Sequence, residues 1–253
     1  MKRFEDRVVM ITGAGSGIGE AAARRFAAEG AKVVLIGRTQ EKLARVAESI
    51  DGETLVRVAD VSDGDAMNRL VEEVIDHYGQ LDVLVNNAGV AQFGRVHEAD
   101  VDDWKKVMSI NVDGVFYASR AALPELLKTK GSIVNVSSVS GLGGNWGMSM
   151  YNASKGAVSN LTRAMALDYG EAGVRVNAVC PGLTRSELTT GVMENETLMK
   201  GFADRTPQGR AAESEEVGDV IVFLASHDAR FVNGVNLPVD GGLMASNGQP
   251  RMG

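Results

Sequence analysis

The chain has 253 residues, of which 44% are hydrophobic and 23% charged, and a formal net charge of −7. Its length accommodates one sizeable core, and an open α/β sheet commonly reaches this size as a single domain. The acidic balance disfavours nucleic acid and an anionic membrane surface as partners. Cys180 is the only cysteine, which excludes an intramolecular disulfide and a cysteine-based zinc cluster.

Neither the start of the chain nor its histidines indicate targeting or metal binding. Residues 1–6 alternate charges and lead directly into a strand pattern, without a signal-peptide core or an apolar run of about 18 residues. We therefore expect a cytoplasmic protein. His77, His97 and His227 are scattered without ligand spacing, so no metal site is predicted.

Short β-branched runs alternate with longer segments of helical period along the chain. Strands are expected at residues 7–12, 32–36, 54–58, 82–86, 132–136, 174–179 and 235–239. Helices are expected at 18–29, 40–49, 63–78, 101–128, 150–169 and 213–225. Near-continuous apolar strands with helix-length connections imply a parallel sheet covered on both faces. The pattern predicts one α/β domain, residues 1–253, with a Rossmann-like, doubly wound, mostly parallel seven-stranded sheet.

Two segments interrupt this alternation. Residues 141–147 carry four glycines, and residues 181–210 are polar and flanked by turn residues. Each could be a plain surface loop. Both follow strands, however, and ligands of a doubly wound sheet bind beyond the carboxyl ends of strands. We therefore expect a substrate lid at about 183–210.

The turn after the first expected strand is rich in glycine. A backbone that approaches a pyrophosphate cannot carry side chains at the contact points, and the following helix N-terminus presents free N–H groups. The spacing is G-x3-G-x-G rather than G-x-G-x-x-G, and turn geometry or helix packing is the alternative explanation. The expected cofactor contacts here are Gly13, Gly15, Ser16, Gly17, Ile18 and Gly19.

The second expected strand ends in Gly37-Arg38-Thr39, where a carboxylate usually holds the adenosine ribose. Arg38 favours a 2′-phosphate instead, because its guanidinium presents a planar fork of donors. NADP(H) is thus favoured over NAD(H), with Arg38 and Thr39 as contacts. A solvated Arg38 paired with Glu41 is the alternative. Asp60, followed by Val61, is expected to accept a hydrogen bond from the adenine amino group, or else to be a turn residue.

Tyr151 and Lys155 are four residues apart in an expected helix, which places both side chains on one face. An ammonium about 4 Å from the phenol, at an effective dielectric near 20, favours the phenolate by about 4 kcal/mol, or about three pKa units before desolvation. The pair would then exchange protons near neutral pH. Alone, this spacing also arises in ordinary surface packing.

Serines at the end of a neighbouring strand support a catalytic interpretation of this pair. Ser137 and Ser138 follow the strand at 132–136, at the sheet edge where chemistry is expected. The Ser138 hydroxyl would bond a substrate oxygen while Tyr151 exchanges its proton. A helix or turn cap is the structural alternative for such a serine.

Several motifs occur in a fixed order along the chain. They are the glycine loop at 12–19, Asn86-Asn87-Ala88-Gly89, Asn111, Ser138, Tyr151 with Lys155, and Pro181-Gly182. Together they span nearly the whole chain and resemble the short-chain dehydrogenase/reductase family. The separation of 13 positions from Ser138 to Tyr151 is similar to that family's spacing.

The resemblance implies a role for each matching residue. Asn111 would hold a water that links Lys155 to solvent, and Ser138 would orient the substrate. Tyr151 would be the acid–base, and Lys155 would bind the nicotinamide ribose. The remaining cofactor contacts implied are Asn87, Ala88, Gly89, Pro181, Gly182, Thr184 and Ser186.

Within the family, the segments at 126–131, 139–147 and 247–250 most resemble meso-2,3-butanediol and acetoin dehydrogenases. Those enzymes usually carry an aspartate where this chain has Arg38, and an apolar residue where it has Thr184. The resemblance implies hydride transfer between a nicotinamide and a small secondary alcohol or ketone, in a homotetramer. The expected substrate contacts are Ser138, Ser140, Asn145, Trp146, Met150 and Tyr151, with loop packing as the alternative for Asn145 and Trp146.

Three rival functions remain at this level. A 3-oxoacyl reductase would share the site, but an acidic carrier protein needs a basic docking surface, and Lys128 and Lys130 supply only a small one. A non-catalytic NADP(H)-binding sensor would not need Ser138, Tyr151 and Lys155 together. A purely structural role leaves all these motifs unexplained.

Overall fold

Seven parallel strands form one sheet within residues 2–249, the part of the chain that the computed structural model describes. The strands are β1 Val8–Thr12, β2 Lys32–Gly37, β3 Thr54–Val58, β4 Val83–Asn86, β5 Ser132–Val136, β6 Arg175–Pro181 and β7 Asn236–Val239. Their order is β3-β2-β1-β4-β5-β6-β7, so the winding direction reverses between β1 and β4. A doubly wound sheet opens a crevice at that point, at the carboxyl ends of the strands. The predicted α/β fold is confirmed, and every strand pair is parallel.

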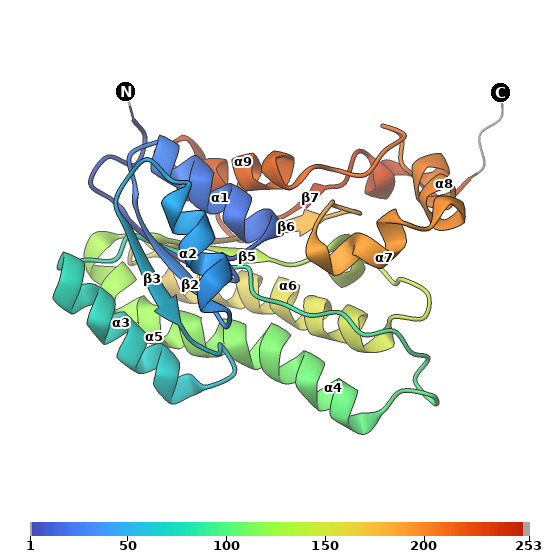
Figure 1. Cartoon of the computed structure of the whole chain (residues 1–253), viewed down its shortest axis with the longest axis horizontal. Helices are drawn as coiled ribbons and strands as arrows, with labels where there is room; N and C mark the ends of the chain where they lie inside the picture. Colours follow the sequence, from blue (N-terminus) through green and yellow to red (C-terminus); the bar gives the residue numbers. More distant parts are fainter. Residues whose placement is uncertain (1, 250–253) are drawn as a thin grey trace.

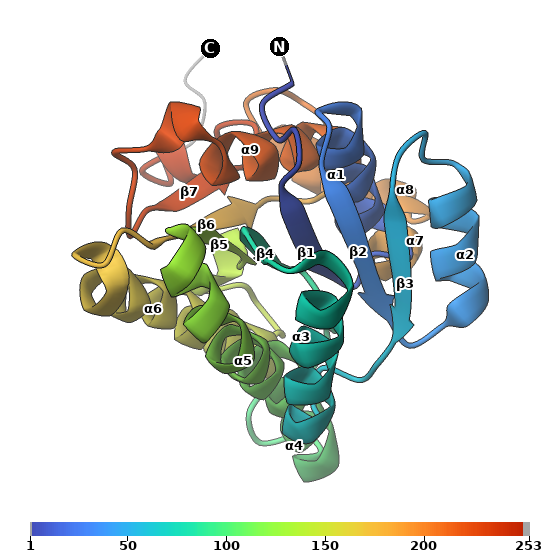
Figure 2. The ribbon, with the colours of Figure 1, turned by 90° about the vertical axis from the view of Figure 1, so that its left-hand side faces the viewer.

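Helices cover both faces of this sheet (Figures 1 and 2). On one face lie α1 Gly17–Ala28, α2 Gln40–Glu48 and α9 Ser214–Ala225, and on the other α3 Gly64–Tyr78, α5 Gly114–Thr129 and α6 Ser149–Gly170. Phe26 and Ile221 belong to the first apolar layer, and Met67 and Leu126 to the second. The central strands read as apolar runs because each is buried on both sides.

The helix expected at 101–128 is interrupted. It consists of α4 Val101–Met108, a π-helical turn at Ser109–Asp113 and then α5. A π turn inserts one residue into the helical ladder and often marks a functional position. Close packing follows the turn, since a Cβ placed on Gly114 would lie 2.7 Å from the Val61 side chain. Sequence periodicity does not reveal a single inserted residue.

The expected irregular segment after β6 contains two helices, which the sequence reading missed. A 3-10 turn at Glu187–Thr189 leads into α7 Thr190–Met193 and α8 Glu196–Arg205. Neither helix has a fully buried residue, so the apolar periodicity that signals a helix is weak. The Asn195 side chain caps α8 by accepting a hydrogen bond from the Leu198 N–H. None of the described helices is long and apolar enough to cross a bilayer.

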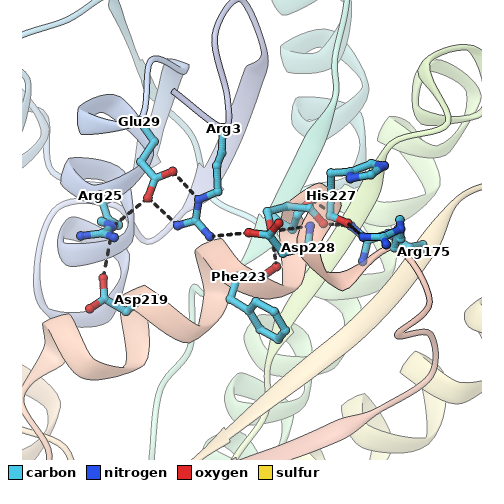
Figure 3. A network of polar contacts seen from close by, with 11 residues as sticks. Arg3, Arg25, Glu29, Arg175, Asp219, Phe223, His227 and Asp228 are labelled. Atoms are coloured by element: carbon cyan, nitrogen blue, oxygen red, sulfur yellow. Dashed lines mark hydrogen bonds and ion pairs between the residues drawn. The ribbon is translucent and has the colours of Figure 1, made fainter. Parts of the chain in front are cut away.

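Arginine side chains fasten the C-terminal end of α9. Arg175 on β6 donates to the carbonyls of Leu224, Ala225 and Ser226 at 2.7, 2.9 and 3.1 Å. These carbonyls end a helix, where intrahelical donors run out. Figure 3 shows the neighbouring surface network, in which Arg25, Glu29 and Arg3 connect to Asp228. The partly buried Arg175 caps the helix, whereas the neighbouring network of charges lies at the surface.

Replacing Arg175 with methionine should lower the free energy of unfolding by about 1.5–3 kcal/mol, the range for hydrogen bonds to a charged group. Arg25 is the matched control, because its side chain is 48% exposed and its ion pairs in the described part of the chain are with the acids Glu29 and Asp219. Arg25→Met should cost less than about 1 kcal/mol. Urea unfolding followed by circular dichroism measures both, and equal losses would contradict the capping role of Arg175.

Candidate active site

A cavity of about 480 Å³ opens at the carboxyl ends of β1, β4, β5 and β6. It brings together residues from six separate stretches of the chain. The predicted site residues that line it are Gly13, Ser16, Gly17, Ile18, Arg38, Asn87, Ala88, Gly89, Ser138, Tyr151, Lys155, Pro181, Gly182, Thr184 and Ser186. Gly15, Gly19, Thr39, Asp60 and Val61 lie outside the lining, as do Asn111, Ser140, Asn145, Trp146 and Met150.

The glycine loop forms a close-fitting turn at one end of the cavity. Gly13 and Gly17 have φ of +67° and +55°, a region that favours glycine. At Gly19 an added Cβ would lie 2.3 Å from the Gly13 carbonyl oxygen. Asn87 holds the turn from β4, because its Nδ2 donates to the carbonyls of Thr12 and Gly13 at 3.0 Å each.

Ser16 is the N-cap of α1 and makes no side-chain capping bond, so its hydroxyl and the helix N–H groups remain available at the cavity wall. A side-chain-free turn beside a helix N-terminus suits an anionic diphosphate. These residues therefore fit the nicotinamide dinucleotide that the sequence implies.

Arg38 lies at the cavity wall, exposed, at the end of β2. Within residues 2–249 it forms no ion pair with Glu41, and its guanidinium faces a cavity wall where an anionic ligand could bind. Asp60 is partly engaged: its Oδ1 accepts from the Ser62 N–H at 2.9 Å and the Ser62 hydroxyl at 2.7 Å. Those bonds, with the charge of Arg38, hold the pKa of Asp60 below its usual value. Asp60 therefore takes part in a local turn through Oδ1, and its contact with the adenine amino group stays a prediction.

Ser138, Tyr151 and Lys155 converge at the other end of the cavity. The Ser138 hydroxyl accepts from the Ser140 N–H at 3.1 Å and hydrogen-bonds the phenol of Tyr151. The Lys155 ammonium lies 5.7 Å from the Tyr151 ring centre and donates to the Val136 carbonyl at 2.8 Å. The three groups thus surround one face of the cavity, with a hydroxyl, a phenol and an ammonium in reach of a small polar molecule.

Burial dominates the acid–base properties of this cluster. It raises the pKa of Tyr151, and the hydrogen bond from Ser138 offsets this only in part. It lowers the pKa of Lys155 to about 8. The pKa of the Tyr151 phenol is therefore raised rather than lowered as the sequence predicted, because desolvation penalises the phenolate more than its surroundings stabilise it.

The rates in the two reaction directions should depend oppositely on pH. Carbonyl reduction needs the protonated phenol of Tyr151, and alcohol oxidation needs its phenolate. Because burial raises the Tyr151 pKa, reduction should stay constant around neutral pH and fall only at alkaline pH, while oxidation rises with pH. Initial rates in both directions from pH 6 to pH 10, the latter about the usual tyrosine pKa, measure this. Oxidation that peaks in the acidic range would contradict it.

Asn111 braces the site rather than lining it. It sits in the π-helical turn, where its Oδ1 accepts from the Val90 N–H at 2.8 Å. Its Nδ2 donates to the Val90 carbonyl at 2.9 Å and the Ser154 hydroxyl at 3.0 Å. Both amide hydrogens are engaged by these contacts, so the side chain could hold a water only as an acceptor. The water-holding role stays a prediction.

The predicted substrate contacts separate into two groups. Ser138 and Tyr151 line the cavity, whereas Ser140 and Met150 are buried behind it. Asn145 turns its amide toward the Met148 sulfur at 3.4 Å, and Trp146 is 85% exposed. Neither therefore reaches the cavity in this arrangement of the 141–147 loop. Thr184 is buried with its hydroxyl donating to the Gly182 carbonyl, so its polarity is directed at the backbone.

Ser137 is a supporting residue to which the sequence reading gave no role. Its hydroxyl donates to the Lys155 carbonyl at 3.0 Å and lies 2.7 Å from the Ser159 hydroxyl. It thereby joins β5 to the helix that carries Tyr151 and Lys155. The only sequence signal was the i, i+4 spacing of Lys155 and Ser159, which is too common to be informative. No group of three metal-ligating side chains occurs in the described part of the chain.

Comparisons with known proteins agree with this geometry. Residues 13–244 match a short-chain dehydrogenase/reductase family model described as enoyl-(acyl carrier protein) reductase. The chain is 53% identical to meso-2,3-butanediol dehydrogenase of Serratia marcescens, over 99% of both chains. It is 40% identical to 3-oxoacyl-(acyl-carrier-protein) reductase of Thermotoga maritima, over 96% of this chain and 99% of that protein.

Solved structures with the same fold include levodione reductase, with a TM-score of 0.93, 36% identity and coverage of 96% and 100% of the two chains. Another is a gluconate 5-dehydrogenase from Burkholderia cenocepacia in complex with NADP and tartrate, with a TM-score of 0.92, 34% identity and coverage of 97% and 98%. With the glycine turn and the Ser138–Tyr151–Lys155 cluster in one cavity, these matches show that the chain is an oxidoreductase that belongs to the short-chain dehydrogenase/reductase family.

Proposed function

We propose that this enzyme interconverts a small vicinal diol and its hydroxyketone, such as 2,3-butanediol and acetoin, with a nicotinamide cofactor. The observation that carries the proposal is the convergence of Ser138, Tyr151 and Lys155 on a cavity that also contains the glycine turn. The 53% identity to a meso-2,3-butanediol dehydrogenase over nearly the whole chain supports this substrate class.

The residues divide the work of the reaction. The bound nicotinamide supplies or accepts the hydride. In the reductive direction, the hydroxyls of Ser138 and Tyr151 bind the carbonyl oxygen, and Tyr151 donates its proton as negative charge develops there. Lys155 holds the nicotinamide ribose and returns protons to Tyr151 from the Asn111 side of the site. Segment 183–210 covers the cavity and limits entry of water.

A 3-oxoacyl thioester reductase is the second candidate, favoured by the 40% identity to such an enzyme. Absorbance of the reduced cofactor, followed with diols, hydroxyketones and acyl thioesters, separates the two. We expect kcat/KM to be highest with 2,3-butanediol or acetoin. Preference for an acyl thioester would overturn the diol assignment, and cofactor binding without turnover of any of these would favour the sensor.

We propose NADP(H) as the preferred cofactor, held at its 2′-phosphate by Arg38. Replacing Arg38 with aspartate should reduce kcat/KM for NADPH by about 10- to 100-fold, the equivalent of about 1.5–3 kcal/mol for a charged hydrogen bond, and should not reduce it for NADH. Arg69→Asp on α3 makes the same charge change at an exposed position outside the cavity lining. An unchanged NADPH/NADH ratio in Arg38→Asp would exclude phosphate recognition by this residue.

We propose that the enzyme is a homotetramer in which the helical stretches 101–128 and 150–169 pack between subunits. Their outer surfaces carry exposed apolar side chains, among them Trp104, Phe116 and Leu167. Apolar patches on a folded surface usually mark contacts. Light scattering of the purified protein tests the mass, and a monomer would contradict the assembly. A cytoplasmic location stays a prediction of the sequence.

A further inference from the structure

The segment that follows β6 is firmly attached at its two ends only. At its start, the Arg185 N–H donates to the Ala212 carbonyl at 2.9 Å, and the Ser214 hydroxyl donates to the Arg185 carbonyl at 2.7 Å. At its end, Thr206 is buried. Between these points α7 and α8 have no fully buried residue. Segments with few buried contacts open at low free-energy cost.

One polar contact ties this span to the rest of the molecule. Within residues 2–249, the pair between Lys42 Nζ and Glu187 Oε2, at 2.5 Å, is the one hydrogen bond or ion pair from residues 187–205 to a residue outside 183–206. Lys42 belongs to α2, on the side of the sheet where α7 also lies (Figures 1 and 2). The two partners are 145 residues apart in the chain.

The position of this pair connects it to the cavity. Glu187 lines the cavity, and the neighbouring Ser186 lies 3.0 Å from the place a Cβ on Gly17 would take. On the opposite side, the Cβ of Lys42 lies 3.0 Å from the place of a Cβ on Gly15. The ion pair therefore joins segment 183–210 to α2 directly beside the glycine turn, at the edge of the cavity that Glu187 lines.

We propose that Lys42 and Glu187 form a latch that retains the bound dinucleotide, and that this latch opens whenever the cofactor is exchanged. Both side chains are about half exposed, so water and salt weaken the pair and it can break readily. A stronger, buried pair would trap the cofactor. The proposal needs a bound dinucleotide and is independent of the diol substrate, so it can fail or succeed separately from the proposed function.

The release rate of NADH, measured by stopped-flow fluorescence, tests the latch in the full-length protein. Lys42→Met and Glu187→Gln should each speed release by about two- to fivefold, the size that an exposed ion pair supports. The double variant should release NADH no faster than either single variant, because both remove the same contact. Lys42→Arg keeps the charge and should retain slow release.

Two further measurements separate a latch from a general loss of structure. Without NADH, hydrogen exchange in residues 190–205 should rise by a similar factor in Lys42→Met and Glu187→Gln. Lys32→Met, which removes the exposed pair with Glu53 at the other end of β2, should change neither release nor this exchange. Unchanged release in the single variants, or effects that multiply in the double variant, would overturn the latch.

Discussion

Replacing Tyr151 with phenylalanine is expected to reduce kcat by about 10²- to 10⁴-fold, the contribution typical of a positioned acid–base group. The change removes one hydroxyl from the cavity wall and leaves the glycine turn and Arg38 untouched. NADH affinity, measured by fluorescence titration, should therefore change little. Loss of turnover with retained binding would identify proton transfer, rather than cofactor binding, as the role of Tyr151.

Tyr78 supplies the matched control. Its hydroxyl is also buried but has no hydrogen-bond partner in the described structure, and it lies on α3 outside the cavity lining. Tyr78→Phe should leave kcat unchanged, since removing an unsatisfied buried hydroxyl costs little. A Tyr151→Phe enzyme that keeps more than about a tenth of its activity would refute the assignment, because an acid–base group contributes at least about 10²-fold.

Gly19→Ala is expected to weaken cofactor binding by more than about 100-fold, the second largest of the predicted effects, because the turn itself must move. The new Cβ would lie 2.3 Å from the Gly13 carbonyl oxygen and 2.4 Å from Asn87 Nδ2. Both atoms belong to the hydrogen bonds that fasten the turn to β4. Relief of the clash displaces the anion-binding backbone, and overpacking of this kind also destabilises by about 1–3 kcal/mol.

Gly201 on α8 provides the control, since a Cβ there meets nothing within 4 Å. Gly201→Ala should leave NADH affinity unchanged and raise stability by about 0.5–1 kcal/mol, as alanine does in a helix interior. Isothermal titration with NADH and thermal unfolding compare the two variants. Wild-type NADH affinity in Gly19→Ala would show that the tight turn is not what binds the diphosphate.

The elements that the sequence predicted well are those whose physical cause is local. The strand at 132–136 has its expected bounds, because a β-branched run buried on both faces leaves a continuous apolar pattern. The strand at 54–58 also has its expected bounds, although it lies at the sheet edge and is only partly buried. The glycine turn was readable because backbone crowding admits no other residue. Tyr151 and Lys155 share a helix face simply because they are four residues apart.

Features that depend on contacts between distant residues could not be predicted. The π-helical turn at Asn111 involves contacts with Val90 and Ser154, on other elements. The same limit applies to the 141–147 loop, where composition suggested substrate contacts but packing turns Asn145 toward Met148 and leaves Trp146 in solvent. The sequence did not predict α7 and α8, because these helices bury too few side chains to produce a helical pattern of apolar residues.

Residue type and short spacing were enough to predict the α/β fold, the glycine turn and the Ser138–Tyr151–Lys155 cluster. The acid–base balance of that cluster required the three-dimensional arrangement, because desolvation depends on what surrounds a side chain in space. That arrangement also brought Lys42 to Glu187, over 145 residues of chain, and so created a lid contact that no local pattern encodes.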